Sequence, residues 1–208
     1  LVLRAFPNPA LERAPDPAAD LSAFLTECLL ADLGTVERRL DRARKERLDA
    51  SEVAAFQTMK AMLEQELPIR AIPAQLLNRD LLKGYGLLTD RPLLVALNHS
   101  EQEAAQPMPA SIARTLAIHH GAGMVLSASV EAEIAAMDRA DQAAFLADLG
   151  LSEPGLSRFI RTAYGLLDLI SFLTVGDDEV RAWPIRRGTR ARQAAGRALP
   201  GLRRGCRG

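Results

Sequence analysis

Leu93-Leu94-Val95-Ala96-Leu97-Asn98-His99-Ser100-Glu101 is the stretch of this 208-residue chain that decides its fold. Its first five residues are apolar, as in a buried parallel strand. The polar loop 98–101 follows, and a second short apolar run, Met124 to Leu126, leads into Ser127-Ala128. The residues between them, 111–120, have a helical pattern. This order of strand, loop, helix and strand predicts an α/β fold with a parallel sheet.

Two helical patterns upstream of this segment predict an antiparallel helical hairpin. In the first, apolar residues recur at spacings of three, four and seven from Leu21 to Leu40, and the far end, 37–47, is dense in charge. The second pattern begins near Ser51 and stops at Pro68. A Met stripe on it is expected to belong to the core. We also expect a helix over Pro73 to Tyr85.

Downstream, helical patterns cover 131–137, 141–149 and 154–169. From Ile170 the period changes to that of strands, and 170–175 and 179–187 predict a hairpin around the turn 176–178. A short helix, 191–198, comes next. Strand, hairpin, strand and helix are the opening of a small β-grasp domain, and the sequence ends before such a domain would close its sheet.

The formal net charge of zero conceals an asymmetry, because the stretch from Arg181 to Gly208 holds nine arginines and no acid. Such a basic end favours an RNA partner, although a solvated arginine-rich tail fits equally well. No apolar run reaches the ~20 residues of a membrane span. Two cysteines, Cys28 and Cys206, make no disulfide framework. We therefore expect a cytoplasmic, reduced protein with no membrane partner, and Cys28 in its core.

The loop and the Ser-Ala turn offer groups that suit a purine base. The Asn98 amide can donate to N7, which both purines share. The His99 ring would lie against the base, and Ser127 and Ala128 would bring loop atoms to its far edge. Guanine-specific sites place Asp where this chain has Glu101, and the extra methylene spoils the paired hydrogen bonds to guanine. By itself, the tetrapeptide also fits an ordinary polar loop after a strand.

Other candidate groups are weaker. His119 and His120 are adjacent, so they cannot share one helix face, and no Cys or acid stands beside them at ligand spacing. We predict the end of a surface helix there, and no metal site. No Ser-His-Asp or Cys-His arrangement is evident, so no catalytic residue is assigned.

Three segments together resemble the YchF, or Obg-like ATPase, family of translation-factor-class P-loop NTPases. The first is 31–40, Ala-Asp-Leu-Gly-Thr-Val-Glu-Arg-Arg-Leu. The second pairs Asn98-His99-Ser100-Glu101 with 127–133. The third runs from 153–156 through 174–176 and 179–183 to 193–196, although Pro184 stands where the family would have Thr. The resemblance covers essentially 1–197.

The resemblance implies a partial P-loop NTPase (G) domain, 1–19 and 73–169, interrupted by the hairpin 20–72 and followed by an incomplete TGS domain of β-grasp type, 170–208. It implies ATP preferred over GTP, hydrolysis with Mg²⁺, and a ribosome or ribosomal RNA partner. The family's Gly-x-x-x-x-Gly-Lys-Ser/Thr loop would lie before Leu1. We therefore expect base binding by Asn98, His99, Glu101, Ser127 and Ala128 without catalysis. The alternative is a nucleotide-independent ribosome- or RNA-binding module.

Overall fold

The computed structural model describes residues 1–46, 49–175 and 179–198 and divides the chain into two compact units. The N-terminal unit is Leu1–Leu156 and the C-terminal unit is Ser157–Gly208. Some expectations fall outside the described residues: the turn 176–178 and the tail beyond 198, with Cys206 and the last arginines.

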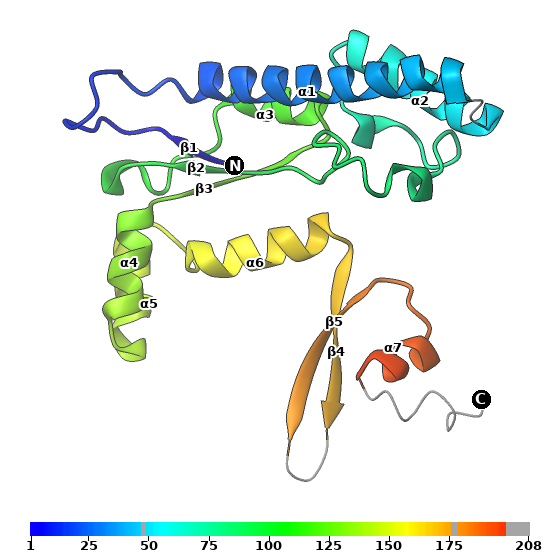
Figure 1. The fold of residues 1–208 in the computed structure, drawn as a ribbon. Helices are drawn as coiled ribbons and strands as arrows, with labels where there is room; N and C mark the ends of the chain where they lie inside the picture. The colour runs from blue at the N-terminus through cyan, green and yellow to red at the C-terminus, as the bar shows by residue number, and fades with distance from the viewer. Residues whose placement is uncertain (47–48, 176–178, 199–208) are drawn as a thin grey trace. The chain divides into compact units, whose positions relative to one another are not determined.

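A three-stranded parallel sheet lies at the centre of the N-terminal unit (Figure 1). Its order is β1 (Val2–Arg4), β2 (Leu94–Asn98) and β3 (Ala122–Leu126). Helices α1 (Pro17–Glu46) and α3 (Ala110–Ile118) contact each other and the sheet, and they share one buried core with it. The three middle residues of β2 are 0–5% exposed, which is the burial expected of a central parallel strand. The α/β prediction is confirmed.

Helices α1 and α2 (Ala50–Glu64) form the predicted hairpin. The Asp49 side chain accepts from the Ser51 amide at 2.8 Å and so caps the start of α2. Val36 and Met59 are fully buried and Phe56 is 1% exposed, so the two helices enclose a dry core. The Met stripe therefore belongs to the core, as predicted. Cys28 is only half-buried, and burial followed by the nearby Asp32 charge raises the pKa of its thiol.

The helix expected over Pro73 to Tyr85 is wrong. Within this segment the structure has one short 3₁₀ turn, η2 (Arg79–Leu82). A second 3₁₀ turn, η1 (Ile69–Ala71), precedes the segment. The Asn78 side chain accepts from the Asp80 amide at 3.1 Å, a local bond that competes with helix formation. Three leucines spaced five residues apart are all buried in the hairpin core: Leu77, Leu82 and Leu87. In a straight helix, residues at this spacing would point in different directions and could not all face one core.

A buried carboxylate ties α1 to the segment that leads into β2. Asp32, 2% exposed, accepts from the amides of Leu88 at 2.9 Å and Thr89 at 2.7 Å. The Thr89 hydroxyl also donates to it at 2.7 Å and accepts from the Ile69 amide at 3.2 Å. Arg70 donates to the carbonyls of residues 89, 91 and 119 at 2.7–3.2 Å. Hydrogen bonds therefore tie α1 of the hairpin to the segment before β2, and Arg70 extends them to the end of α3.

After the sheet, α4 (Ala128–Ala136) and α5 (Arg139–Asp148) pack around a small core of their own. Helix α6 (Gly155–Leu166) follows. Its first amides donate to a side chain of α4, because Glu131 accepts from Gly155 at 2.6 Å and from Leu156 at 3.1 Å. A carboxylate at a helix N-terminus complements the helix dipole, so Glu131 fixes where α6 begins.

The C-terminal unit contains an antiparallel hairpin of β4 (Leu169–Val175) and β5 (Val180–Arg186), followed by α7 (Ala191–Ala198). Its strands match the predicted ones to within one residue at each end. Trp183 donates its indole N–H to the Thr174 hydroxyl at 3.0 Å, and the Arg181 guanidinium lies 4.5 Å from the Trp183 ring centre. None of the helices in the described part of the chain has the length and hydrophobicity of a transmembrane segment.

Candidate nucleotide-base site

The predicted site residues gather at the carboxyl edge of the sheet. Asn98, the last residue of β2, pairs with Leu126, the last residue of β3. The His99 amide then donates to the Leu126 carbonyl at 2.9 Å, so both chains leave the sheet together. Residues 98–101 and 127–128 therefore lie at one edge, where parallel α/β sheets bind their ligands.

The Asn98 side chain joins the end of β2 to the start of α4. Its Oδ1 atom accepts from the Ala128 amide at 2.9 Å, across 30 residues of chain. This bond fixes the orientation of the amide and leaves its NH₂ group without a hydrogen-bond partner among the described residues. Asn98 is half-buried, so the NH₂ group is a positioned donor at the sheet edge.

Ser127 and Ala128 contribute in different ways. Ser127 is 2% exposed, and its hydroxyl lies 2.9 Å from that of Ser129. Ala128 is exposed, and its amide is bound to Asn98. Because the Ser127 hydroxyl is already bonded to Ser129 in the first turn of α4, these residues shape the site chiefly through their backbone.

His99 and Glu101 differ in burial: the His99 side chain is largely buried, and Glu101 is exposed. The His99 side chain is 11% exposed, with Nδ1 3.4 Å from Glu103 Oε2 and Nε2 buried without a partner in the described structure. The Ser100 hydroxyl donates to the same Glu103 oxygen at 3.2 Å. Glu101 opens the short 3₁₀ turn η3 (Glu101–Glu103) and is exposed. Sequence reasoning missed Glu103, although its i, i+4 spacing from His99 was a usable signal.

In the described residues, no three His, Cys, Asp or Glu side chains gather in a way that could hold an ion. The predicted helix end at His119 is confirmed, because α3 stops there and His120 has a φ of 50°.

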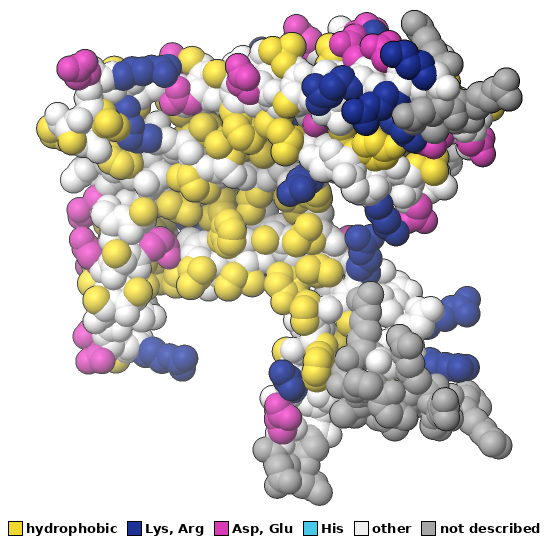
Figure 2. All heavy atoms as spheres, in the orientation of Figure 1, with side chains coloured by type: hydrophobic (Ala, Val, Ile, Leu, Met, Phe, Trp, Pro, Cys, Tyr) yellow, Lys and Arg dark blue, Asp and Glu magenta, His cyan; other side chains and the backbone are white. Residues whose placement is uncertain are grey.

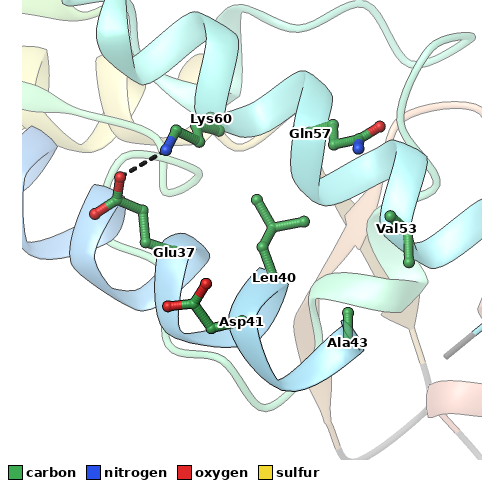
Figure 3. A pocket seen from close by; sticks show the side chains of 7 residues that line it. All are labelled: Glu37, Leu40, Asp41, Ala43, Val53, Gln57 and Lys60. Atoms are coloured by element: carbon green, nitrogen blue, oxygen red, sulfur yellow. Dashed lines mark hydrogen bonds and ion pairs between the residues drawn. The ribbon is translucent and has the colours of Figure 1, made fainter. Parts of the chain in front are cut away.

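A hollow of about 610 Å³ lies elsewhere, between α1 and α2. Figure 3 shows its lining, with Glu37 paired to Lys60 at 2.7 Å and Asp41 alongside. It is an open, polar groove on the hairpin and contains none of the predicted base-binding residues.

The fold and the sheet edge define an α/β protein with a positioned polar site at the carboxyl ends of parallel strands. Comparisons with known proteins give the family. Residues 169–205 match the family profile YchF-GTPase_C, described as a protein of unknown function (DUF933). The chain is 33% identical over 207 residues to the "Ribosome-binding ATPase YchF" of Bacillus subtilis, covering 94% of this chain and 57% of the relative.

Two further relatives agree. The protein of the same name from Haemophilus ducreyi is 37% identical over 205 residues, covering 93% of this chain and 56% of the relative. The solved YchF GTPase of Schizosaccharomyces pombe superposes with a TM-score of 0.75 at 28% identity, covering 97% of this chain and 58% of that one. The chain belongs to the YchF family. It spans a little over half the length of these relatives.

Proposed function

We propose that this chain supplies the base-recognition part of a YchF-type nucleotide site, in a cytoplasmic, ribosome-associated nucleotide-binding protein. The observation that carries this proposal is the Asn98 side chain, whose Oδ1 atom is held by the Ala128 amide at 2.9 Å. With the oxygen fixed, the NH₂ group is oriented to donate to a purine N7. A donor positioned before the ligand arrives loses little conformational freedom on binding.

ATP is the proposed nucleotide, in preference to GTP. An Asp at position 101 would accept two hydrogen bonds from guanine, and Glu101 carries its carboxylate about one methylene further out. Adenine has neither the N1–H nor the 2-amino group that donate in guanine, and the exposed Glu101 carboxylate would stay solvated beside it. The discrimination would come from guanine: an N1–H or 2-amino donor enclosed without an acceptor costs about 1–3 kcal/mol, so we expect the GTP affinity to be about 10- to 100-fold lower.

The phosphates and Mg²⁺ would be held by groups other than these. The 208 residues contain no Gly-x-x-x-x-Gly-Lys-Ser/Thr loop, whose amides and lysine bind phosphate and whose hydroxyl binds Mg²⁺. In the complete family protein, Mg²⁺ would neutralise charge on the phosphates. This chain's own residues would bind and orient the base. We therefore propose that this stretch by itself does not hydrolyse ATP.

Titration of the chain with fluorescent ATP and GTP analogues tests the proposal. Asn98→Ala should weaken binding of both analogues at least tenfold, whereas Gln102→Ala, a neighbouring exposed position, should leave both unchanged. Glu101→Asp should strengthen the GTP analogue relative to the ATP analogue. Equal binding by Asn98→Ala and the unaltered chain, or ATP turnover by the 208-residue chain with an ordinary KM, would refute the proposal.

The ribosome is the proposed macromolecular partner, reached through the helical hairpin, 20–72, and the basic region of an incomplete TGS domain, 170–208. The names of the bacterial relatives support a ribosomal partner. The alternative function is a ribosome- or RNA-binding module that ignores nucleotide, and the arginine-rich stretch after Arg181 favours it. Cosedimentation with ribosomes separates the two: binding that changes with an ATP analogue supports the first function, and unchanged binding supports the second.

A further inference from the structure

We propose that a hollow at the amino ends of β2 and β3 binds a small hydrophobic carboxylate, with Arg70 and Arg91 holding its charged group. This hollow, which we call the amino-edge hollow, measures about 240 Å³ and lies between α1, residues 88–93 and the end of α3. Leu93 directly precedes β2, and its carbonyl accepts from the Ala122 amide, at the start of β3, at 2.8 Å. The five residues of β2, about 16 Å, separate this edge from the base site, so the proposal goes beyond the proposed function.

Much of the lining is apolar and comes from two separate segments of the chain. Six of these side chains are Phe24, Leu25, Leu29, Leu88, Pro92 and Leu93. Leu25 and Leu93 are buried, whereas Phe24 is 39% and Leu88 44% exposed, so the hollow opens to solvent beside these last two. An apolar cavity of about 150 Å³ holds benzene, so the amino-edge hollow has room for a ring with a short chain.

The charged part of the lining is basic. Arg70, Arg91 and His119 line the hollow, and none of the lining residues that the structure describes is Asp or Glu. Hydrophobic side chains reach the surface over much of the face drawn in Figure 2, so apolar surface alone does not identify a binding site. An enclosed apolar lining combined with cations does, because it matches a molecule that has a hydrocarbon body and a single negative charge.

The Arg70 guanidinium is held in place without contacting a carboxylate. Its Nε and Nη1 atoms donate to the carbonyls of residues 89, 91 and 119 at 2.7–3.2 Å. Asp32 acts on the Arg70 charge from nearby, but its oxygens accept from Leu88 and Thr89. In the described structure, Nη2 of Arg70 has no hydrogen-bond partner, so it can donate to a ligand. Burial lowers the pKa of the Arg70 guanidinium, and a bound carboxylate would favour its charged form.

A structural role explains only part of this arrangement. The three carbonyl bonds account for Nε and Nη1 of Arg70, but not for Nη2, nor for Arg91, which is exposed and forms no ion pair within the described residues. His119 Nδ1 is also buried without a hydrogen-bond partner there, which is uncommon in folded proteins. A carboxylate suits the hollow better than a phosphate, because a second negative charge is costly to bring against apolar side chains.

Calorimetric titration of the full chain with 3-phenylpropionate tests the proposal. We expect one site with a Kd below about 5 mM, the weakest expected for a ligand of this size. The neutral 3-phenylpropanamide, of nearly the same shape, should bind at least about tenfold more weakly, and inorganic phosphate should not compete. Arg91→Gln should weaken 3-phenylpropionate about 3- to 10-fold. The matched control Arg114→Gln, an exposed cation of α3 outside the lining, should leave binding unchanged.

Arg70→Gln should weaken 3-phenylpropionate at least about tenfold, and Arg91→Gln keeps the test valid if the loss of the carbonyl bonds impairs folding. Absence of saturable binding, equal binding of the amide, or an equal loss in Arg114→Gln would overturn the proposal. Amide NMR shifts caused by 3-phenylpropionate should centre on 24–29, 88–93 and 119. Shifts centred on 98–101 and 127–128, or displacement by an ATP analogue, would place the carboxylate in the base site and refute the amino-edge hollow.

Discussion

Replacing Asp32 with Ala should be among the most destabilising single changes in the N-terminal unit. The carboxylate is 2% exposed and receives three hydrogen bonds of 2.7–2.9 Å from Leu88 and Thr89. After the substitution, the Thr89 amide and hydroxyl face a small apolar gap. Thr89 itself is 3% exposed, so water does not easily replace the lost acceptor.

The expected cost follows from these three bonds. A hydrogen bond to a charged group contributes about 1.5–3 kcal/mol, and a buried donor left unpaired costs about 1–3 kcal/mol. The Leu88 side chain is 44% exposed, so we expect its amide to regain a partner in water and to recover part of the loss. Desolvation of the carboxylate, which the substitution relieves, offsets a further part. A net loss of about 3–5 kcal/mol in the free energy of unfolding remains.

Urea unfolding followed by far-UV circular dichroism measures this loss, since α1 and α2 contain about half of the residues in the described α-helices. Trp183, the single tryptophan, belongs to the other unit, so its fluorescence does not report the change. Asp41→Ala, an exposed acid on the same helix, is the matched control and should cost less than about 0.5 kcal/mol. Thr89→Val should cost about 1–3 kcal/mol and couple to Asp32→Ala. A loss below 1 kcal/mol for Asp32→Ala would refute the reasoning.

Three further predictions concern other contacts. Glu131→Ala removes the acceptor for the first amides of α6 and should cost about 1–2 kcal/mol, seen as faster hydrogen exchange at Gly155 and Leu156; unchanged exchange would contradict it. Gly123→Ala places a Cβ 2.6 Å from a Leu116 methyl carbon and 2.9 Å from the Met108 methyl carbon. This overpacking should lower the free energy of unfolding in urea by about 1–3 kcal/mol, whereas the control Gly165→Ala, which has open space around its Cβ, should lower it by less. Burial, and then the Arg70 charge, lowers the pKa of His119 below its ordinary 6.5 in the folded chain. As the pH drops through about 6.5, the unfolded chain therefore binds a proton at His119 before the folded chain does, and the free energy of unfolding should fall. His119→Asn should flatten that pH dependence, and an equal slope in the variant would contradict the assignment.

Long periodic segments were predictable from the sequence because one physical rule governs each of them. The heptad-like spacing from Leu21 to Leu40 specified a helix with one buried face, and α1 has one. The apolar run before Asn98 required burial on both faces, which only the centre of a parallel sheet provides.

Features that depend on contacts between distant segments were not predictable in this way. The leucines of 73–87 reach the hairpin core from a segment of turns. The spacing of apolar residues alone cannot distinguish such a segment from a helix. At the site, the sequence placed Asn98 beside the Ser-Ala turn. It did not reveal that Ala128 would fix the amide, or that the ring of His99 would turn toward Glu103. Those details depend on side-chain packing across 30 residues or on one local turn.

The pairing of β1 with β2 has a consequence for how the chain folds as it is made. Val2 of β1 pairs with Ala96 of β2, and Leu3 with Leu97, across more than 90 residues of chain. At synthesis rates of about 5–20 residues per second, β1 waits about 5–20 s for its partner strand. The α1–α2 hairpin and the leucines of 77–87 that complete its core all precede β2 in the chain, so they can fold during that interval. The topology therefore predicts that the hairpin forms before the sheet that orients Asn98.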